Sequence, residues 1–364
     1  GPEAPAGHRR PLMMWWLPGC LGTLLSVPLF ALRRASPTSR PYARYFQRIC
    51  SLPEVQAEPE GGEGSPGPSQ MHVVYASDPA NFVGLLSSML SLSRHLGRRP
   101  RACHVHVLVR AEHLPAAEEL LGCFWRELPS PSRAPVVVLH PLRPLPAAVA
   151  RFVASVRWRQ RWERVHLEAF AKVYLHTYLP TVPRVLWLDH DTIVEASVEP
   201  LYKVNMTHAL AGAPMLFQLH EYMARRGVRY QTLDRRLQNT SVQAFNAGVL
   251  VVDLRRWQVQ AISEQFEEWA DLLSGFNISS RQADKEQMVL NLVFQGAYDS
   301  LDWRWNAQDV AWGPKVPPCY IEQARILHFA GHFKPWDTPW FRPAVQGSEA
   351  FDRYAPSLGC GALR

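Results

Sequence analysis

Apolar and polar positions change period several times along the chain after residue 71. Short apolar runs bounded by turn residues predict strands, and longer segments with apolar residues three or four positions apart predict helices. The two kinds of segment alternate, which favours an α/β fold with a mainly parallel central sheet flanked by helices. Residues 141–150, rich in Pro and Ala, are interpreted as a loop. The predicted strands are 72–75, 104–109, 136–139, 184–188, 209–213 and 248–252, and the predicted helices are 82–96, 113–125, 166–179, 257–273 and 284–295.

The strand at 184–188 ends in Asp189-His190-Asp191. Side chains two positions apart on a strand share a face, so the two carboxylates can converge on one point. Converging carboxylates repel each other unless a positive charge lies between them, and a divalent cation is the natural occupant. The alternative is a strand end with two solvated acids. Because ligands bind beyond the carboxyl ends of strands in open α/β sheets, we expect Ala76-Ser77-Asp78 to line the same crevice.

A second group of residues with chemical potential is the run His328-Phe329-Ala330-Gly331-His332-Phe333-Lys334-Pro335-Trp336. His328 can supply an imidazole nitrogen to a metal already held by two carboxylates. Gly331 allows the backbone to approach a diphosphate closely, and Lys334 provides a point charge for phosphate. Each residue alone is commonplace, but their ordered combination predicts a site for a metal and a diphosphate.

The N-terminal region contains a sequence pattern that predicts the cellular compartment of the protein. Residues 11–32 carry no charged side chain and are long enough to cross a hydrocarbon core. The interpretation is a short cytosolic tail at 1–10, a signal anchor at 11–32, a stem or flexible linker at 33–70, a folded domain at 71–345 and a C-terminal tail at 346–364. A cleaved signal peptide is the alternative to the anchor. Together with sequons at Asn205, Asn239 and Asn277, the pattern predicts a single-pass type II protein of the Golgi or ER membrane with a lumenal domain.

Charge and cysteine content narrow the partners. The formal net charge is +7, and Arg residues crowd the segments 9–48 and 151–164. No helix-turn-helix, zinc-finger or RNP pattern is visible in the sequence, so a nucleic-acid partner is not expected. The six cysteines form no CxxC pair, which argues against a structural zinc site. One or two isolated disulfides are compatible with their spacing, and no pairing is assigned.

These motifs, in this order, resemble the retaining, nucleotide-sugar-dependent glycosyltransferases of family 8, over residues 72–340. The resemblance implies a GT-A fold, a metal site at Asp189, Asp191 and His328, and diphosphate contacts from Gly331 and Lys334. It also implies that the run 76–82 grips the uridine of the donor. In that run Asp78 is the safer uracil contact, because one extra residue precedes Asn81. The remaining donor-binding positions that the resemblance implies are Ala76 and Lys172.

Two further matches with the family concern the sugar. Asn246 and Gly248 match an Asn-x-Gly segment whose amide bonds sugar hydroxyls, although a tight turn before a buried strand is equally compatible. Glu286 and Gln287 match an Asp-Gln segment beside the anomeric carbon, and they are the expected catalytic residues. Glu286 is one methylene longer than the usual Asp. The segment 303–308 also resembles the family and is expected to be structural or to face the acceptor.

The expected function is metal-dependent, retaining transfer of a sugar from a UDP-sugar to a hydroxyl of a glycan, glycoprotein or polysaccharide. Mn²⁺ is the expected metal, with Mg²⁺ as the alternative, because the Asp, Asp, His set mixes hard and borderline ligands. Retention can arise by double displacement through an enzyme nucleophile or by front-face attack. The alternatives are a metal-dependent phosphoester hydrolase and a non-catalytic nucleotide-sugar-binding protein. The sequence does not identify the sugar or the acceptor.

Overall fold

The structure is a computed structural model, and most of the chain after residue 70 is described in it. The described residues are 39–53, 70–96, 102–130, 134–156, 167–225, 228, 233, 237, 240–276, 285–308, 310–311, 316–331, 333–336, 345–357 and 360. The second cluster of arginines, from Arg157 onward, lies outside them, as do the sequons at Asn239 and Asn277.

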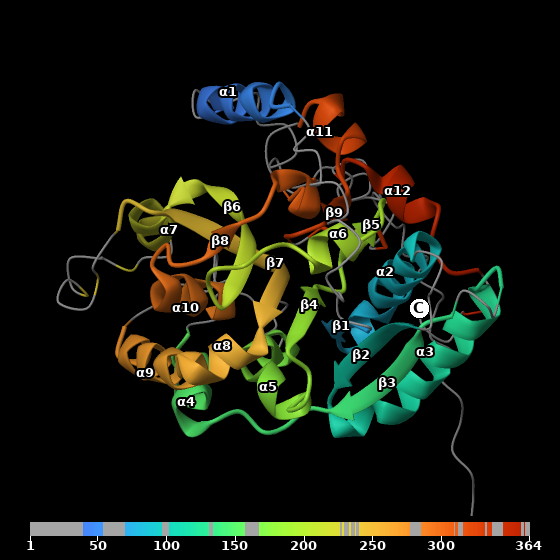
Figure 1. The fold of residues 1–364 in the computed structure, drawn as a ribbon, viewed down its shortest axis with the longest axis horizontal. Helices are drawn as coiled ribbons and strands as arrows, with labels where there is room; N and C mark the ends of the chain where they lie inside the picture. The colour runs from blue at the N-terminus through green and yellow to red at the C-terminus, as the bar shows by residue number, and fades with distance from the viewer. Residues whose placement is uncertain are drawn as a thin grey trace, which may run out of the picture. The chain divides into compact units, whose positions relative to one another are not determined.

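A seven-stranded sheet forms the centre of the described region, in the order β3-β2-β1-β4-β7-β6-β8 (Figure 1). Strands β1, β2, β3 and β4 run parallel, and β7 is antiparallel to both of its neighbours. The predicted α/β fold with a mainly parallel sheet is confirmed. The strands are β1 (Met71–Ala76), β2 (Cys103–Val109), β3 (Val136–Pro141), β4 (Arg184–Leu188), β6 (Leu210–Gln218), β7 (Gln243–Asp253) and β8 (Asp299–Ser300).

Both faces of this sheet are buried, which explains why its inner strands are near-continuous apolar runs. Val73 and Tyr75 of β1 face one hydrophobic core, together with helices α2 (Phe82–His95) and α3 (Leu114–Glu127). Val74 and Ala76 face a second core on the opposite side. That second core packs against η6 (Leu167–Tyr174), α4 (Ala147–Ser155), α8 (Leu254–Val259), α9 (Ile262–Ser274) and α10 (Lys285–Phe294).

Several helices differ from the prediction. The segment expected as one helix at 166–179 is mainly a 3₁₀ helix, η6, followed by the short α5 (Leu175–Tyr178). The helix expected at 257–273 is divided at Ala261, whose φ of 51° interrupts the helix between α8 and α9. Part of the expected loop at 141–150 belongs to α4, because its run of alanines has high helix propensity and begins directly after Pro146.

Two segments that the sequence placed outside the folded domain pack against it. Helix α1 (Ser39–Cys50) falls within the predicted stem, and a disulfide joins Cys50 to Cys319 in α11 (Pro318–Glu322). Helix α12 (Ser348–Asp352) falls within the predicted C-terminal tail, and Cys360 beyond it is bonded to Cys123. The compact unit therefore begins at Ser39.

The membrane prediction requires a correction. The predicted cytosolic tail at 1–10 and signal anchor at 11–32 lie outside the described residues. Among the residues that are described, no helix is long and apolar enough to cross a membrane. The longest, α2 and α3, have 14 residues each. At about 1.5 Å per residue they reach about 21 Å, less than a hydrocarbon core of about 30 Å. The predicted placement as a single-pass type II protein of the Golgi or ER membrane is contradicted by this finding.

Candidate active site

Asp189 and Asp191 lie where β4 leaves the sheet. The Asp189 N–H donates to the Gly248 carbonyl at 2.8 Å, which is the last bond between β4 and β7. The chain then turns, and the Thr192 hydroxyl donates to the Asp189 carbonyl at 2.8 Å as β5 (Thr192–Val194) begins. The turn places both carboxylates at the carboxyl edge of the sheet, where α/β folds bind ligands.

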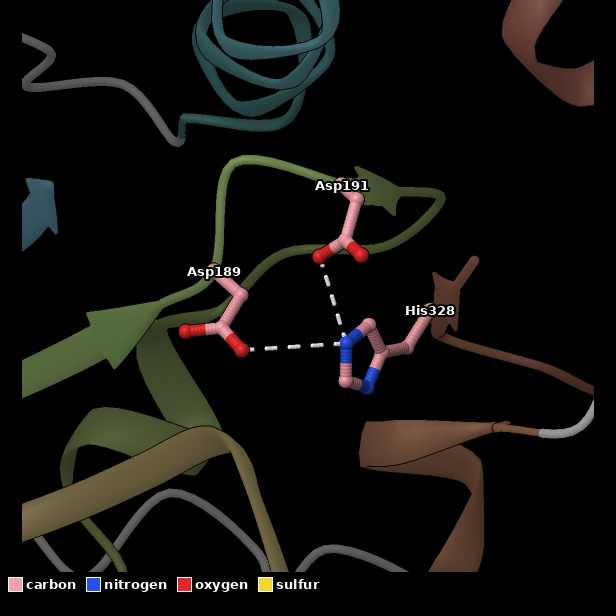
Figure 2. A group of neighbouring side chains, drawn as sticks. All are labelled: Asp189, Asp191 and His328. Atoms are coloured by element: carbon pink, nitrogen blue, oxygen red, sulfur yellow. Dashed lines mark ion pairs between the residues drawn. The ribbon is translucent and has the colours of Figure 1, made fainter. Parts of the chain in front are cut away.

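A small second sheet brings His328 to these carboxylates. Strand β9 (Ile326–His328) pairs antiparallel with β5, and the register places His328 opposite Thr192. The His328 Nε2 lies 3.2 Å from Asp191 Oδ1 and 3.8 Å from Asp189 Oδ2 (Figure 2). One ligand atom from each of the three residues lies within 4.8 Å of the others. Residues 137 positions apart in the sequence thus form one potential metal site.

Gly248 provides the surface on which the His328 ring lies. A Cβ added at Gly248 would stand 2.0 Å from Cε1 of His328 and 2.6 Å from both ring nitrogens. No side chain larger than hydrogen fits there without displacing the imidazole. The sequence suggested a sugar contact or a tight turn for this glycine. The structure shows a third role, a close approach between β7 and β9.

The three side chains fit a divalent cation. Asp191 is only 7% exposed, and its Oδ1, although near the His328 ring, makes no hydrogen bond to any residue that the structure describes. A buried carboxylate oxygen without a donor is costly unless a ligand satisfies it. Two carboxylates and an imidazole are a donor set that Mn²⁺ and related ions accept. This unpaired oxygen therefore marks where a cation would bind.

Lys334 supplies positive charge to the same carboxylate. Its ammonium pairs with Asp191 Oδ2 and also donates to the Phe329 carbonyl at 2.9 Å. Burial alone would raise the pKa of Asp191, but the ammonium charge of Lys334, the largest opposing cause, outweighs burial and holds that pKa well below its usual range. Asp191 is therefore ionised at neutral pH, as a metal ligand must be.

The loop that carries Gly331 and Lys334 is anchored at its end by Trp336. The indole of Trp336 packs so closely on Gly84 of α2 that a Cβ there would stand 2.3 Å from the ring. Gly331 has a φ of 116°, a backbone conformation that side chains with a Cβ rarely adopt. This positive φ explains why glycine occupies the position.

On β1, the predicted uridine-binding run forms a short turn at the same edge of the sheet. Ala76 is the last residue of β1, and Asp78 precedes the 3₁₀ helix η2 (Pro79–Asn81). The Asn81 side chain donates to Asp78 Oδ1 at 3.0 Å, and its backbone N–H donates to the Asp78 carbonyl at 3.0 Å. The two predicted donor contacts thus support each other, and their roles toward a nucleoside stay predictions.

Lys172 lies beneath the carboxylates and is fully buried. Its ammonium donates to Asp189 Oδ1 at 3.3 Å, to Glu286 Oε1 at 3.1 Å and to the Ala247 carbonyl at 3.1 Å. An ammonium has three N–H donors, and these contacts use all three. Burial opposes its charge, but Asp189 and Glu286 outweigh burial and raise its pKa. In this arrangement Lys172 joins the metal side of the site to Glu286.

Both ends of the Gln287 amide, and the Oδ1 of Asn246, are committed to bonds within the protein. The Gln287 Oε1 accepts the Ala247 N–H at 2.8 Å, and its Nε2 donates to the Tyr222 hydroxyl at 2.8 Å. The Asn246 Oδ1 accepts the Gly248 N–H at 2.9 Å. Glu286, by contrast, keeps 14% of its side chain exposed. The geometry therefore favours Glu286 over Gln287 as the residue that faces a bound sugar.

Two residues at the site were not predicted. Trp187 donates from Nε1 to Asp189 Oδ1 at 2.7 Å, and Asn306 lies 2.9 Å from the His328 Nδ1. Trp187 gave only an apolar strand signal. Asn306 lies in the segment 303–308, whose resemblance to the family was the available signal.

The fold and the site define a class of protein. A mainly parallel sheet, an Asp-x-Asp turn at its carboxyl edge and a distant histidine make up the GT-A type of nucleotide-diphospho-sugar transferase. The comparison with protein families agrees, because the model described as glycosyl transferase family 8 matches residues 159–339. The chain belongs to glycosyltransferase family 8.

Individual relatives and solved structures resemble this chain at low sequence identity. Glycosyltransferase 8 domain-containing protein 2 of Mus musculus is 27% identical over 205 residues, covering 49% of this chain and 59% of that protein. Glycosyltransferase 8 domain-containing protein 1 of Xenopus tropicalis is 28% identical over 218 residues, covering 52% and 58%. The matches thus span less than two thirds of these relatives.

Among solved structures, an active-site mutant of LgtC aligns with a TM-score of 0.55 at 20% identity, over 78% of this chain and 95% of that one. The apo structure of the bifunctional glycosyltransferase WbbM aligns with a TM-score of 0.58 at 15% identity, over 83% and 52%. At these identities the alignments establish the fold and nothing finer.

Proposed function

We propose that the protein transfers a sugar from a UDP-sugar to a hydroxyl acceptor, with a divalent metal and with retention at the anomeric carbon. The observation that carries the proposal is the group of half-buried Asp189 with buried Asp191 and His328, in which Asp191 Oδ1 has no hydrogen-bond donor among the described residues. Family membership supports the reaction class. The UDP-sugar donor, the identity of the metal and the retention of configuration go beyond what family membership supports and are part of the proposal.

The leaving group of such a reaction is a diphosphate, which gains negative charge as the glycosidic bond breaks. A bound cation at this site would act as a Lewis acid and stabilise that charge. Lys334 has an ammonium already placed at the same carboxylate, within reach of phosphate oxygens bound beside Asp191. We assign Lys334 to the diphosphate, because preorganised charge where charge develops is usually the largest contribution to catalysis.

Glu286 is the residue we assign to the sugar. Its carboxylate pairs with the Lys172 ammonium at 3.1 Å, and part of its side chain stays exposed. An anionic oxygen there can stabilise the positive charge that develops on the anomeric carbon, or attack that carbon in a double displacement. We assign Gln287 to holding β7 in place beside the sugar, through its bond to the Ala247 N–H.

The experiment is an assay of the purified chain with a panel of UDP-sugars, with Mn²⁺ or with EDTA. We expect one UDP-sugar to release UDP with Mn²⁺ and not with EDTA, and labelled sugar to appear on a hydroxyl acceptor. Glu286→Gln is expected to keep Mn²⁺-dependent UDP binding and to lose turnover. Release of phosphate from simple phosphate esters would instead identify a hydrolase. Binding of UDP without turnover of any donor would identify a non-catalytic binding protein.

A further inference from the structure

We infer that Asn306 is a positioning residue that holds an imidazole proton of His328 on Nδ1, so that Nε2 is the nitrogen left to bind a cation beside Asp189 and Asp191. Asn306 ends the 3₁₀ helix η9 (Trp303–Asn306), a segment to which the proposed function gives no role. The inference rests on that function, because an unprotonated Nε2 matters only if a metal binds there. It extends the site to a residue beyond the ligands.

A chain of hydrogen bonds that begins at the backbone fixes the orientation of both amides. The Gly248 N–H can only donate, so the atom of Asn246 that lies 2.9 Å from it must be the oxygen. That oxygen is 2.9 Å from one end of the Asn306 amide, which must therefore be the NH₂ group. The other end of Asn306, its oxygen, then faces His328 Nδ1 at 2.9 Å. Since an amide oxygen only accepts, Nδ1 must carry the proton.

The relay is shielded from water, so a solvent molecule does not readily replace its members. Asn246 is 6% exposed, Asn306 1% and His328 3%. Backbone bonds hold the relay in register, because the Ala307 N–H donates to the Ile326 carbonyl at 2.9 Å and the His328 N–H donates to the Ala307 carbonyl at 3.0 Å. The residue after Asn306 is thus bonded to β9 directly at His328.

This arrangement has a chemical consequence for a metal. An imidazole binds a cation through its unprotonated nitrogen. A hydrogen-bond acceptor at one ring nitrogen holds the proton there and so leaves the other nitrogen to bind the cation. With the proton on Nε2 instead, the N–H would point at the two carboxylates and occupy the cation's place. Removal of such an outer partner typically lowers metal affinity about 10- to 100-fold. We expect a loss of this size for Asn306→Leu.

The first test reads the tautomer without metal or turnover. Nitrogen NMR of the full chain labelled with ¹⁵N-histidine, in EDTA at pH 9, is assigned for His328 by comparison with His328→Gln. We expect a protonated Nδ1 and an unprotonated Nε2 in the unmodified protein, and loss of this preference in Asn306→Leu. Asn306→Asp keeps an acceptor for the Nδ1 proton but loses the NH₂ donor to Asn246, so we expect it to keep the proton on Nδ1 while it breaks the bond to Asn246. A neutral ring with its proton on Nε2 in the unmodified protein overturns the inference.

The second test measures Mn²⁺ affinity from the paramagnetic resonance signal of free Mn²⁺. Asn291→Leu is the matched control, since Asn291 is also a buried asparagine and bonds the Phe245 backbone. We expect weaker Mn²⁺ binding in Asn306→Leu and near-normal binding in Asn291→Leu. Equal loss in Asn306→Leu and Asn291→Leu would show a merely structural role and refute the inference. If Mn²⁺ binding and the His328 tautomer are as expected but the unmodified protein transfers no sugar, only the proposed function is refuted.

Discussion

Two groups of buried and half-buried titratable side chains lie on or beside the central sheet and have opposite surroundings. One is the acidic–histidine cluster, Asp189, Asp191 and His328, at the carboxyl edge of β4. The other is the histidine row, His72, His106 and His140, which crosses β1, β2 and β3. Both are concentrations of metal-binding residue types, so residue type alone does not distinguish them.

The histidine row satisfies itself. The Nε2 of His106 is 3.0 Å from His72 Nδ1, and its Nδ1 is 2.9 Å from His140 Nε2. A neutral imidazole has one donor and one acceptor, so one proton in each gap completes both contacts of His106. Burial first, and neighbouring histidines second, lower the pKa of His106 to about 3 and that of His72 to about 4. The row is therefore neutral and complete at neutral pH.

The acidic–histidine cluster is charged and incomplete. Asp191 stays ionised although it is buried, and its Oδ1 lacks a donor within the described part of the chain. A buried polar group without a partner is rare in folded proteins and calls for an explanation such as an ion. The comparison teaches that an unsatisfied atom within a set of metal-binding side chains, rather than residue type alone, marks the candidate cation site.

The largest expected effect is that of Asp191→Asn on sugar transfer. The substitution keeps the shape of the side chain and removes the charge that would hold a metal and that now pairs with Lys334. We expect kcat/KM with the preferred UDP-sugar to fall by at least about 100-fold, the loss typical when one electrostatic contact to a transition state is removed. His106→Gln, in the histidine row, is the control and should keep most of the activity. Equal losses of kcat/KM in Asp191→Asn and His106→Gln would contradict the functional difference between the acidic–histidine cluster and the histidine row.

Metal binding to the folded state should appear as a thermal shift. At a Mn²⁺ concentration 100 times its Kd, binding stabilises the folded protein by about 2.7 kcal/mol, and we expect the melting temperature to rise accordingly. His328→Gln should lose the shift because it removes a ligand, whereas His106→Gln should retain it. The measurement is a melting curve of each protein with and without Mn²⁺. A shift that disappears only in His106→Gln would place the metal in the histidine row.

The sheet and the Asp-x-Asp turn could be predicted because their signals are local. The apolar runs at 104–109 and 184–188 match β2 and β4 closely, since a strand buried on both faces needs little beyond its own sequence pattern. The spacing of Asp189 and Asp191 likewise lies within one turn. His328 was predicted as a possible ligand from the motif around it, and the resemblance then matched it to the third ligand, because only tertiary structure brings β9 beside β5.

What could not be predicted depends on pairing between distant segments. Helix α1 belongs to the compact unit through a disulfide between residues 269 positions apart, and no local pattern specifies that pair. Gly248 was interpreted as a sugar contact or a turn residue. Its actual neighbour, the ring of His328, comes from another strand that the local sequence does not indicate. Asn306 was missed for the same reason. Its function lies in the bonds to Asn246 and His328, which exist only once three segments have met.

Gly248→Ala tests whether the cluster depends on a close approach that the sequence did not reveal. The new Cβ would meet the His328 ring at 2.0 Å, so the ring or β7 must move. Overpacking of this kind typically costs about 1–3 kcal/mol, and we expect a loss of that size in urea unfolding together with weaker Mn²⁺ binding. Gly122→Ala in α3 is the control, because its nearest neighbour, the end of the Arg126 side chain, stands 3.6 Å away. Unchanged stability in Gly248→Ala would contradict the described contact.

The smallest effect concerns the histidine row and pH. His72 and His106 have pKa values of about 4 and about 3 in the folded protein, below the usual value of about 6.5 that the unfolded chain restores. Between pH 6.5 and about 4 the unfolded state therefore binds more protons, and the free energy of unfolding falls as the pH falls. Each imidazole contributes at most about 1.4 kcal/mol per pH unit, and partial exposure of His72 reduces its share. Urea unfolding at pH 7, 6 and 5 measures the slope. His106→Gln should flatten it, because the variant keeps a polar side chain that does not titrate. A slope that is unchanged in His106→Gln but lost in Asp191→Asn would assign the acid sensitivity to the acidic–histidine cluster and reverse the comparison.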